Sequence, residues 1–346
     1  MKTKLQIESC QLQVPHRERR PRVFPTFNLQ PFRFQRDLAS RRTTFNLLRA
    51  FTLIEILVVV VLMSFIILAL MAVFNGTQTA FRASLTQSDV LEGGRSAMSM
   101  IKSDLEAMTP SYGVSNGAVN FSTAVQTGTN MPLVQSLIGS STGQLRTNVL
   151  ESFFILSRQN TTWTGVGYVV DTTSPNYFNP LYRFSLSTNA QAADPMVLFN
   201  IFLTNLPAYN GLPISPTNPC MSHLMDGVVD LRVRAYDPNG IWMTSQYNYI
   251  GTNIFPVTTN QNVWFTPPAW GPTWGEAGFI MFSNTVPASV EIYLGVLEDR
   301  AIQRAESLPN AAPVWAQSNY LALRAGQVHV FRQRVWIRNV DPSAYQ

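Results

Sequence analysis

Residues 49–74 read RAFTLIEILVVVVLMSFIILALMAVF, and this stretch decides what kind of chain the sequence encodes. Residues 56–74 within it are 19 consecutive residues without a charge. As an α-helix they would span about 29 Å, which matches the hydrocarbon core of a bilayer. Arg41, Arg42 and Arg49 lie directly before the run. Because basic residues stay on the cytoplasmic side, the pattern predicts a single membrane pass with a cytoplasmic N-terminus and an exported C-terminal bulk.

The charge of the chain is divided unevenly along its length. Residues 1–50 hold 11 Lys and Arg against 3 Asp and Glu, whereas residues 51–346 hold 14 against 17. The net charge of +5 therefore belongs to the first fifty residues. A pI of 9.4 would ordinarily suggest nucleic acid as a partner. Because the basic excess stops where the apolar run begins, we expect no nucleic-acid partner.

Two other interpretations of the apolar run are weaker. A buried core helix is disfavoured by the length of the run and by its basic flank. An ordinary secretory signal has a shorter apolar region followed by a small-residue cleavage site, whereas residues 75–78 read NGTQ. The unusual feature is at the N-terminal end of the apolar run, where Glu55 lies inside the apolar face. A lone carboxylate in a membrane segment is energetically costly, so Glu55 is predicted to have a function.

The string Ala50-Phe51-Thr52-Leu53-Ile54-Glu55 before an apolar helix resembles the prepilin cleavage and methylation motif of type IV pilin-like proteins and type II secretion pseudopilins. The resemblance implies that a membrane prepilin peptidase cuts between Ala50 and Phe51 and then methylates the new amino terminus of Phe51. Ala50 stands where that family usually has glycine. Glu55 would be the fifth residue of the mature chain. Its pairing with the positive N-terminus of a neighbouring subunit would remove the cost of an isolated buried charge and fix the axial register.

This resemblance implies a division of the chain into four parts. Residues 1–50 would be a basic cytoplasmic leader that is cleaved off, and residues 51–75 a transmembrane helix carrying the methylation motif. Residues 76–108 would continue the helix as an amphipathic segment, and residues 109–346 would form a β-rich periplasmic head with long loops. The localisation implied is the inner membrane, with one pass and a periplasmic head that can enter an extracytoplasmic filament.

Apolar residues at spacings of three and four support the amphipathic continuation of the helix. They are Phe81, Leu85, Met98, Ile101, Leu105 and Met108. Asn75-Gly76 and Gly93-Gly94 are expected to be points where the helix bends or loosens. Thr109-Pro110 is expected to end it, because a residue before proline is pushed out of the helical region.

The rest of the chain is expected to be mainly antiparallel β structure, which makes the fold α+β. The resemblance implies a pilin-like arrangement, in which the long helix packs on this β head. Residues 229–236 alternate between apolar and polar side chains, as a half-exposed strand does, and residues 290–296 alternate in the same way. Asp237-Pro238-Asn239-Gly240 is expected to be a turn. Further strands are expected at residues 153–156, 167–170, 181–186 and 331–338, with a turn at 174–176 between the second and third of these. Long loops are expected at residues 111–149 (or a weak hairpin there), 191–220 and 241–285.

The order of these pieces resembles the J-type minor pseudopilin of type II secretion. The resemblance rests on Leu181-Tyr182-Arg183, on residues 226–231, on Tyr236-Asp237 with Trp242, and on residues 286–292. It implies a structural subunit that helps to assemble or cap a short periplasmic filament. A prepilin peptidase, sister pseudopilins or pilins and an inner-membrane assembly platform would be its partners. Two alternatives stay open: a minor pilin of a surface fibre used for adhesion or DNA uptake, and a membrane-anchored periplasmic enzyme or binding protein.

Catalytic and metal chemistry have little support in the sequence. Cys220 and His223 are three residues apart, which could indicate a nucleophile pair or half a metal site. One Cys and one His do not complete a four-ligand zinc site. Asp226, Asp230 and Asp237 fit no calcium-loop spacing and are expected at turns and on the surface. We therefore expect no enzymatic activity, no cofactor and no metal.

Tryptophans gather in the long segment 241–285. Loop tryptophans can bind glycans or partner proteins, or they can fix a long loop to its own sheet, and the second interpretation is favoured. The four residues are Trp242, Trp264, Trp270 and Trp274.

Overall fold

The structure is a computed structural model, and its described residues form two units. These residues are 52–112, 118–126, 134–136, 145–174, 178–190, 194–243, 262–266, 278–308, 320, 323–324 and 327–345. One unit ends at Arg82 and the other begins at Ala83. Helix α1 (Leu53–Glu106) contributes residues to both units.

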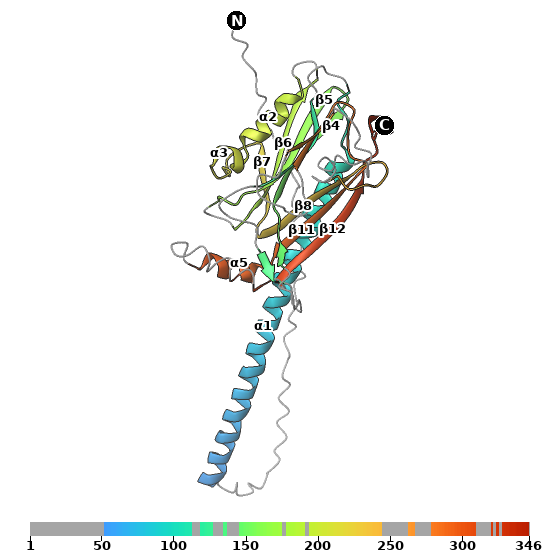
Figure 1. The fold of residues 1–346 in the computed structure, drawn as a ribbon. Helices are drawn as coiled ribbons and strands as arrows, with labels where there is room; N and C mark the ends of the chain where they lie inside the picture. Colours follow the sequence, from blue (N-terminus) through green and yellow to red (C-terminus); the bar gives the residue numbers. More distant parts are fainter. Residues whose placement is uncertain are drawn as a thin grey trace, which may run out of the picture. The chain divides into compact units, whose positions relative to one another are not determined.

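The larger sheet has seven antiparallel strands in the order β7-β6-β5-β4-β1-β10-β9. Figure 1 shows β4, β5, β6 and β7 side by side in the upper part of the molecule. The strands are β1 (Val119–Val125), β4 (Glu151–Gln159), β5 (Thr162–Val170), β6 (Leu181–Asn189), β7 (Met221–Met225), β9 (Val263–Thr266) and β10 (Gly278–Phe282).

The smaller sheet has three antiparallel strands in the order β12-β11-β8. They are β8 (Val228–Tyr236), β11 (Ser289–Leu297) and β12 (Val328–Trp336). A separate hairpin joins β2 (Val134–Ser136) to β3 (Leu145–Thr147). The described residues therefore have an α+β fold with a long N-terminal helix and antiparallel sheets, as the sequence predicts.

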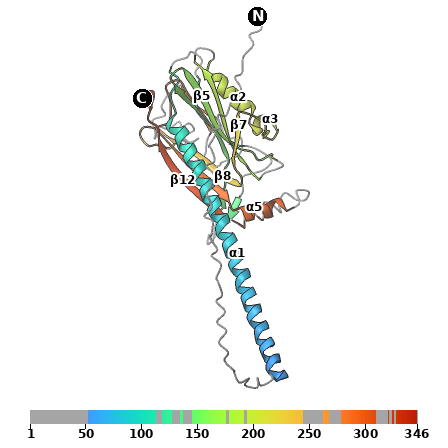
Figure 2. The ribbon, with the colours of Figure 1, turned by 180° about the vertical axis from the view of Figure 1, so that it is seen from behind.

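The main core lies where the C-terminal half of α1 meets both sheets. One continuous apolar cluster includes Ile101 and Leu105 of α1, Phe153 of β4, Leu231 of β8 and Ile292 of β11, all of them almost completely buried. Figure 2 shows this part of α1 crossing the sheets on the side away from α2 and α3. An amphipathic helix is stable when its apolar stripe is buried in this way.

The opposite face of the larger sheet is covered by α2 (Met196–Thr204) and α3 (Pro207–Asn210). Phe199 and Phe202 of α2 pack on Phe154 of β4, with ring centroids 5.3 and 5.5 Å apart. At Gly167 of β5 an added Cβ would lie 2.3 Å from the Phe202 ring, so glycine permits this close approach. Because the sheet is covered on both faces, β4 is buried continuously from Glu151 to Ser157 and does not alternate between buried and exposed residues.

A third cluster lies under α5 (Asp299–Glu306). Ala301, Ile302 and Ala305 of this helix pack on Val229 and Leu297 of the smaller sheet. After β12 the chain ends in a 3₁₀ turn, η2 (Pro342–Tyr345), whose Tyr345 hydroxyl donates to the Val286 carbonyl oxygen at 2.6 Å.

Most of the predicted strands are confirmed. Residues 153–156 lie in β4, 167–170 in β5, 181–186 in β6, 229–236 in β8, 290–296 in β11 and 331–336 in β12. β5 and β6 pair with each other in antiparallel register as expected. The predicted turn after β8 is also present, since the Gly240 amide donates to the Asp237 carbonyl oxygen and Gly240 has a φ of 79°.

The prediction that β8 and β11 are half exposed is wrong in part. Asp230 of β8 is completely buried, and β11 is buried along almost its whole length, including Glu291. β11 is the central strand of its sheet, and long arginine side chains from both neighbouring strands cover its outer face.

The predicted loops contain elements that the sequence did not reveal. Segment 111–149 includes β1 besides the β2–β3 hairpin, segment 191–220 includes α2 and α3, and segment 241–285 includes β9 and β10. α2 has the sequence MVLFNIFLT, which is apolar on nearly all sides. Such a short run gives no helical periodicity by which to tell a helix from a strand.

Candidate functional site

The residues predicted for cleavage, methylation and assembly lie at or just before the N-terminal end of α1. Ala50 and Phe51 lie outside the described residues. Glu55 lies in the first turn of the helix, where its side chain is exposed. Its backbone amide donates to the Thr52 carbonyl oxygen at 3.0 Å and to the Thr52 Oγ1 at 3.4 Å. The string Thr52-x-x-Glu55 thus also has the form of a helix N-terminal capping box, and a carboxylate at this position favours helix formation.

Glu55 is surrounded along α1 by exposed apolar surface. Every side chain from Thr52 to Arg82 is exposed, including Leu53 at 82%, Phe65 at 65% and Val73 at 66%. Of the residues that the structure describes, α1 is the one helix long and apolar enough to cross a membrane. A water-soluble unit does not normally leave so large an apolar surface uncovered.

The predicted amphipathic stripe of α1 is correct only in its second half. Met98, Ile101, Leu105 and Met108 are buried, but Phe81 is 64% exposed and Leu85 is 49% exposed. The spacing of Phe81 and Leu85 fits a buried stripe, yet burial within the chain begins only at Val90.

The glycines do not interrupt α1, which runs through Gly76, Gly93 and Gly94. An added Cβ at Gly94 would lie 2.2 Å from the Phe331 ring of β12, whereas one at Gly76 would have nothing within 4 Å. Gly94 therefore lets the helix and the smaller sheet approach closely. The sequence-based expectation of a weak point at Gly94 missed this packing role.

The C-terminal end of α1 is joined to the larger sheet by a group of three side chains that the sequence did not indicate. Arg183 of β6 donates from Nε to Oδ2 of Asp104 at 2.8 Å and from a terminal nitrogen to Oδ1 at 3.0 Å. The hydroxyl of Tyr168 in β5 donates to the same carboxylate. Burial and the neighbouring carboxylate both raise the pKa of Tyr168, so its hydroxyl remains a donor at neutral pH. No local sequence pattern signals this group, because Asp104, Tyr168 and Arg183 come together only in the fold.

Cys220 and His223 have separate surroundings. Cys220 packs at the margin of the α2 cluster, and its amide donates to Asn218 Oδ1 at 3.1 Å. His223 Nε2 lies 2.8 Å from Asp226 Oδ1, and its ring meets Tyr182 edge-on. The two side chains therefore contact different partners in the fold.

The three aspartates considered as calcium ligands lie at separate places. Asp226 pairs with His223, and Asp237 closes the turn after β8 by accepting from the Ile241 amide at 2.7 Å. Asp230 accepts from the Val149 amide at 3.0 Å and from Arg232 Nε at 2.9 Å, so its predicted surface position is wrong. Within the described ranges, no group of three or more His, Cys, Asp or Glu side chains could hold a metal ion.

Two of the four tryptophans fall within the described residues. Trp242 forms a bridge with Tyr236, and the Arg234 guanidinium lies 4.6 Å from its ring centroid, so it fixes its segment to the smaller sheet. Trp264 of β9 packs edge-on against Phe282 but remains 63% exposed. Trp270 and Trp274 lie outside the described residues.

The residues behind the J-type resemblance fall on one strand of the larger sheet and two of the smaller one. Arg183 lies on β6, residues 228–231 on β8 and residues 289–292 on β11. Comparison with known proteins gives no assignment, because no protein-family model matches the chain and no match was found among curated proteins or solved structures.

Proposed function

We propose that the chain is a minor pseudopilin, a structural subunit that helps to assemble or cap a short periplasmic filament of a type II secretion-like system. The observation that carries the proposal is the string from Ala50 to Glu55 directly before a helix that exposes apolar side chains as far as Arg82. The string provides a cleavage and methylation site, and the exposed helix provides a membrane anchor that can later pack against neighbouring subunits.

The second half of α1 supports the same proposal. It is buried by antiparallel sheets from Val90 onward and is fixed there by Asp104 and Arg183. A pilin-like subunit has to combine an apolar helix for assembly with a folded head on the same helix. Inner-membrane insertion with a periplasmic head follows from the basic residues before the apolar run.

Glu55 is the assembly residue in this proposal. Once the apolar helices are bundled, a lone carboxylate among them needs a cationic partner. The methylated amino terminus of Phe51 on an adjacent subunit would be that partner. Because Thr52-x-x-Glu55 also has the form of a capping box, a test must separate the charge of Glu55 from its helix-capping ability.

The test is cross-linking of the full chain to sister pseudopilins co-expressed in the same membrane. Glu55→Gln keeps a side chain that can accept hydrogen bonds but removes the charge, so membrane insertion should be unchanged while the cross-linked product falls at least tenfold. Glu106→Gln is the control, because Glu106 is a half-buried acid on the same helix that pairs with Lys102. Normal incorporation of the Glu55→Gln subunit would contradict the proposal.

A further inference from the structure

The free edge of the smaller sheet is a long, regular strand. β12 pairs with β11 in nine uninterrupted steps, from Ser289↔Trp336 to Leu297↔Val328. In the part of the chain that the structure describes, no strand lies on its other side, and Figure 1 shows β12 at the outer margin of the sheet. Unpaired backbone donors and acceptors on such an edge are a template for another strand.

The opposite edge of the same sheet is occupied in a different way. The Leu231 amide of β8 donates to the Val149 carbonyl oxygen at 2.8 Å, and the Val233 amide donates to Glu151 Oε2 at 2.6 Å. The fold therefore uses the edge amides of β8 internally and leaves β12 as the edge that can accept a partner.

The outer face beside this edge has an excess of positive charge. The cross-strand neighbours of Glu291 are Arg234 on β8 and Arg334 on β12, and Arg332 also donates to its carboxylate. One carboxylate thus faces three guanidinium groups. The Arg332 side chain is still 64% exposed, and the Arg334 guanidinium lies 3.9 Å from the ring centroid of Tyr236.

Aromatic side chains accompany these arginines. Trp336 lies on the same outer face of β12, is 67% exposed, and has the Arg334 guanidinium 5.0 Å from its ring centroid. Exposed tryptophan and arginine side chains together are typical of residues that dominate the binding energy of protein interfaces. The charge of this face selects a partner that carries acidic side chains.

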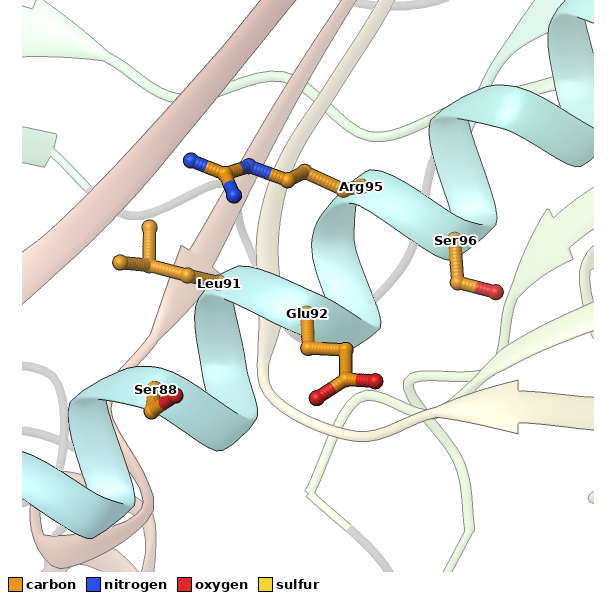
Figure 3. Close-up of a pocket in the computed structure, with 5 residues that line it drawn as sticks. All are labelled: Ser88, Leu91, Glu92, Arg95 and Ser96. Atoms are coloured by element: carbon orange, nitrogen blue, oxygen red, sulfur yellow. The ribbon is translucent and has the colours of Figure 1, made fainter.

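The inner face of β12 is incompletely covered. Phe331 is only partly buried although its ring touches α1 at Gly94. Beside this contact, α1 borders an open hollow of about 460 Å³ lined by Ser88, Leu91, Glu92, Arg95 and Ser96. Figure 3 shows Leu91 and Arg95 extending from the helix to one side, and Glu92 and Ser96 to another. A strand added to β12 would place its inward side chains beside Phe331.

We propose that the β12 edge binds an extended, acid-rich segment of a partner protein as a fourth strand of the smaller sheet. Alternate residues of that segment are acidic and lie beside Arg332 and Arg334, where opposite charges on adjacent strands stabilise the pairing. The residues between them are apolar and cover Phe331. Main-chain hydrogen bonds supply the affinity and the alternating side chains supply the specificity.

A second copy of this chain fits the edge less well. Antiparallel pairing of two β12 edges would bring the arginines of both copies together, and like charges on adjacent strands repel. This surface belongs to the folded head and does not depend on the proposed place of the chain in a filament.

The test uses the full chain in non-ionic detergent and three synthetic nine-residue peptides. The first alternates valine and glutamate, the second replaces glutamate by lysine, and the third keeps the glutamates but replaces two central valines by proline. Fluorescence anisotropy should show binding of the first peptide at least tenfold tighter than of the other two. Hydrogen exchange should show new protection of alternate β12 amides, because only strand addition uses them.

Variants of the chain separate strand addition from a general loss of structure. Arg332→Glu combined with Arg334→Glu should weaken binding of the glutamate peptide at least tenfold and should create binding of the lysine peptide, which shows that the variant is folded. Arg300→Glu combined with Arg304→Glu on α5 is the control for the same change in total charge, because both arginines are exposed on that helix. It should change the affinity less than twofold.

Three results would overturn the proposal. Equal binding of the proline-containing peptide would mean attraction by charge without a strand. Unchanged exchange of the β12 amides in the presence of saturating glutamate peptide would exclude this edge. Dimerisation of the chain alone with protected β12 amides would make a second copy the occupant.

Discussion

At the scale of single residues, the carboxylate of Asp104 joins the end of α1 to two strands of the larger sheet. It accepts two hydrogen bonds from Arg183 and one from Tyr168 while remaining only 16% exposed. Burial alone would lower the pKa of Arg183, but its hydrogen bonds and charge interaction with Asp104 outweigh burial and raise the pKa above its ordinary value. Arg183 therefore remains charged at neutral pH.

Arg183→Met tests this connection. It leaves the Asp104 carboxylate partly buried beside Tyr168 without its cation, so the free energy of unfolding should fall by about 2 kcal/mol. Urea unfolding of the full chain in detergent, followed by tryptophan fluorescence, would measure it. Lys102→Met is the matched control, since it removes a surface ion pair with Glu106 on the same helix and should cost about 0.5 kcal/mol or less. An equal loss of unfolding free energy in both variants would mean that the Asp104–Arg183 pair stabilises the fold no more than a surface ion pair does.

Glu291 gives the smaller sheet a defined response to acid. Partial burial alone would raise its pKa, but hydrogen bonds from Arg332 and Tyr236 and the charges of Arg332 and Arg234 outweigh burial and lower it. Folding therefore favours the ionised form. Its contribution to stability is fully present above the ordinary glutamate pKa of about 4.3 and is lost as the pH falls through the lower folded-state value.

Glu291→Gln should consequently reduce stability at pH 7 and have a progressively smaller effect as the pH falls below about 4. Urea unfolding of the full chain and of the variant between pH 3 and pH 7 would measure the difference. A stability difference between the two proteins that grows toward low pH would contradict a lowered pKa of Glu291 in the folded state.

At the scale of elements, the sequence predicted what local patterns determine. α1 ends at Glu106, three residues before the expected stop at Thr109, and the hairpin of β5 and β6 was anticipated from two apolar segments around a turn. α2 was missed because its burial against Phe154 depends on glycines of β5 that are distant in sequence. The exposure of Phe81 could not be predicted either, since helical spacing does not show where the covering sheet begins.

Gly94 allows a direct test of how α1 meets β12. Alanine is the better helix former by about 1 kcal/mol, but at position 94 its Cβ would meet the Phe331 ring at 2.2 Å. Gly94→Ala should therefore destabilise the chain by about 1–3 kcal/mol. Gly76→Ala is the same change where nothing lies within 4 Å, and it should be neutral or stabilising.

Chemical denaturation of both alanine variants in detergent would compare these effects. Phe331→Leu combined with Gly94→Ala should recover part of the lost stability, because the smaller side chain makes room for the Cβ. Equal stabilisation by alanine at positions 76 and 94 would show that the close approach of α1 and β12 does not constrain the fold.

At the scale of the whole molecule, the chain combines an exposed apolar helical segment, residues 52–82, with a folded unit whose core contains the rest of α1. The residues proposed for processing, Ala50 and Phe51, directly precede the described part of that segment. The sequence could indicate them because the motif is local and continuous. It could not indicate that Asp104 pairs with Arg183 or that β12 is an edge strand, because both depend on strands that come together only in the fold.

Mass spectrometry of the N-terminus, on protein purified from membranes that contain a prepilin peptidase, would show whether the chain is processed between Ala50 and Phe51. We expect a mature chain that begins at Phe51 with a methylated amino group. We also expect the full-length precursor to persist when the peptidase is absent. A chain that retains residues 1–50 in the presence of an active peptidase, or one that begins after Phe74, would contradict the proposed function.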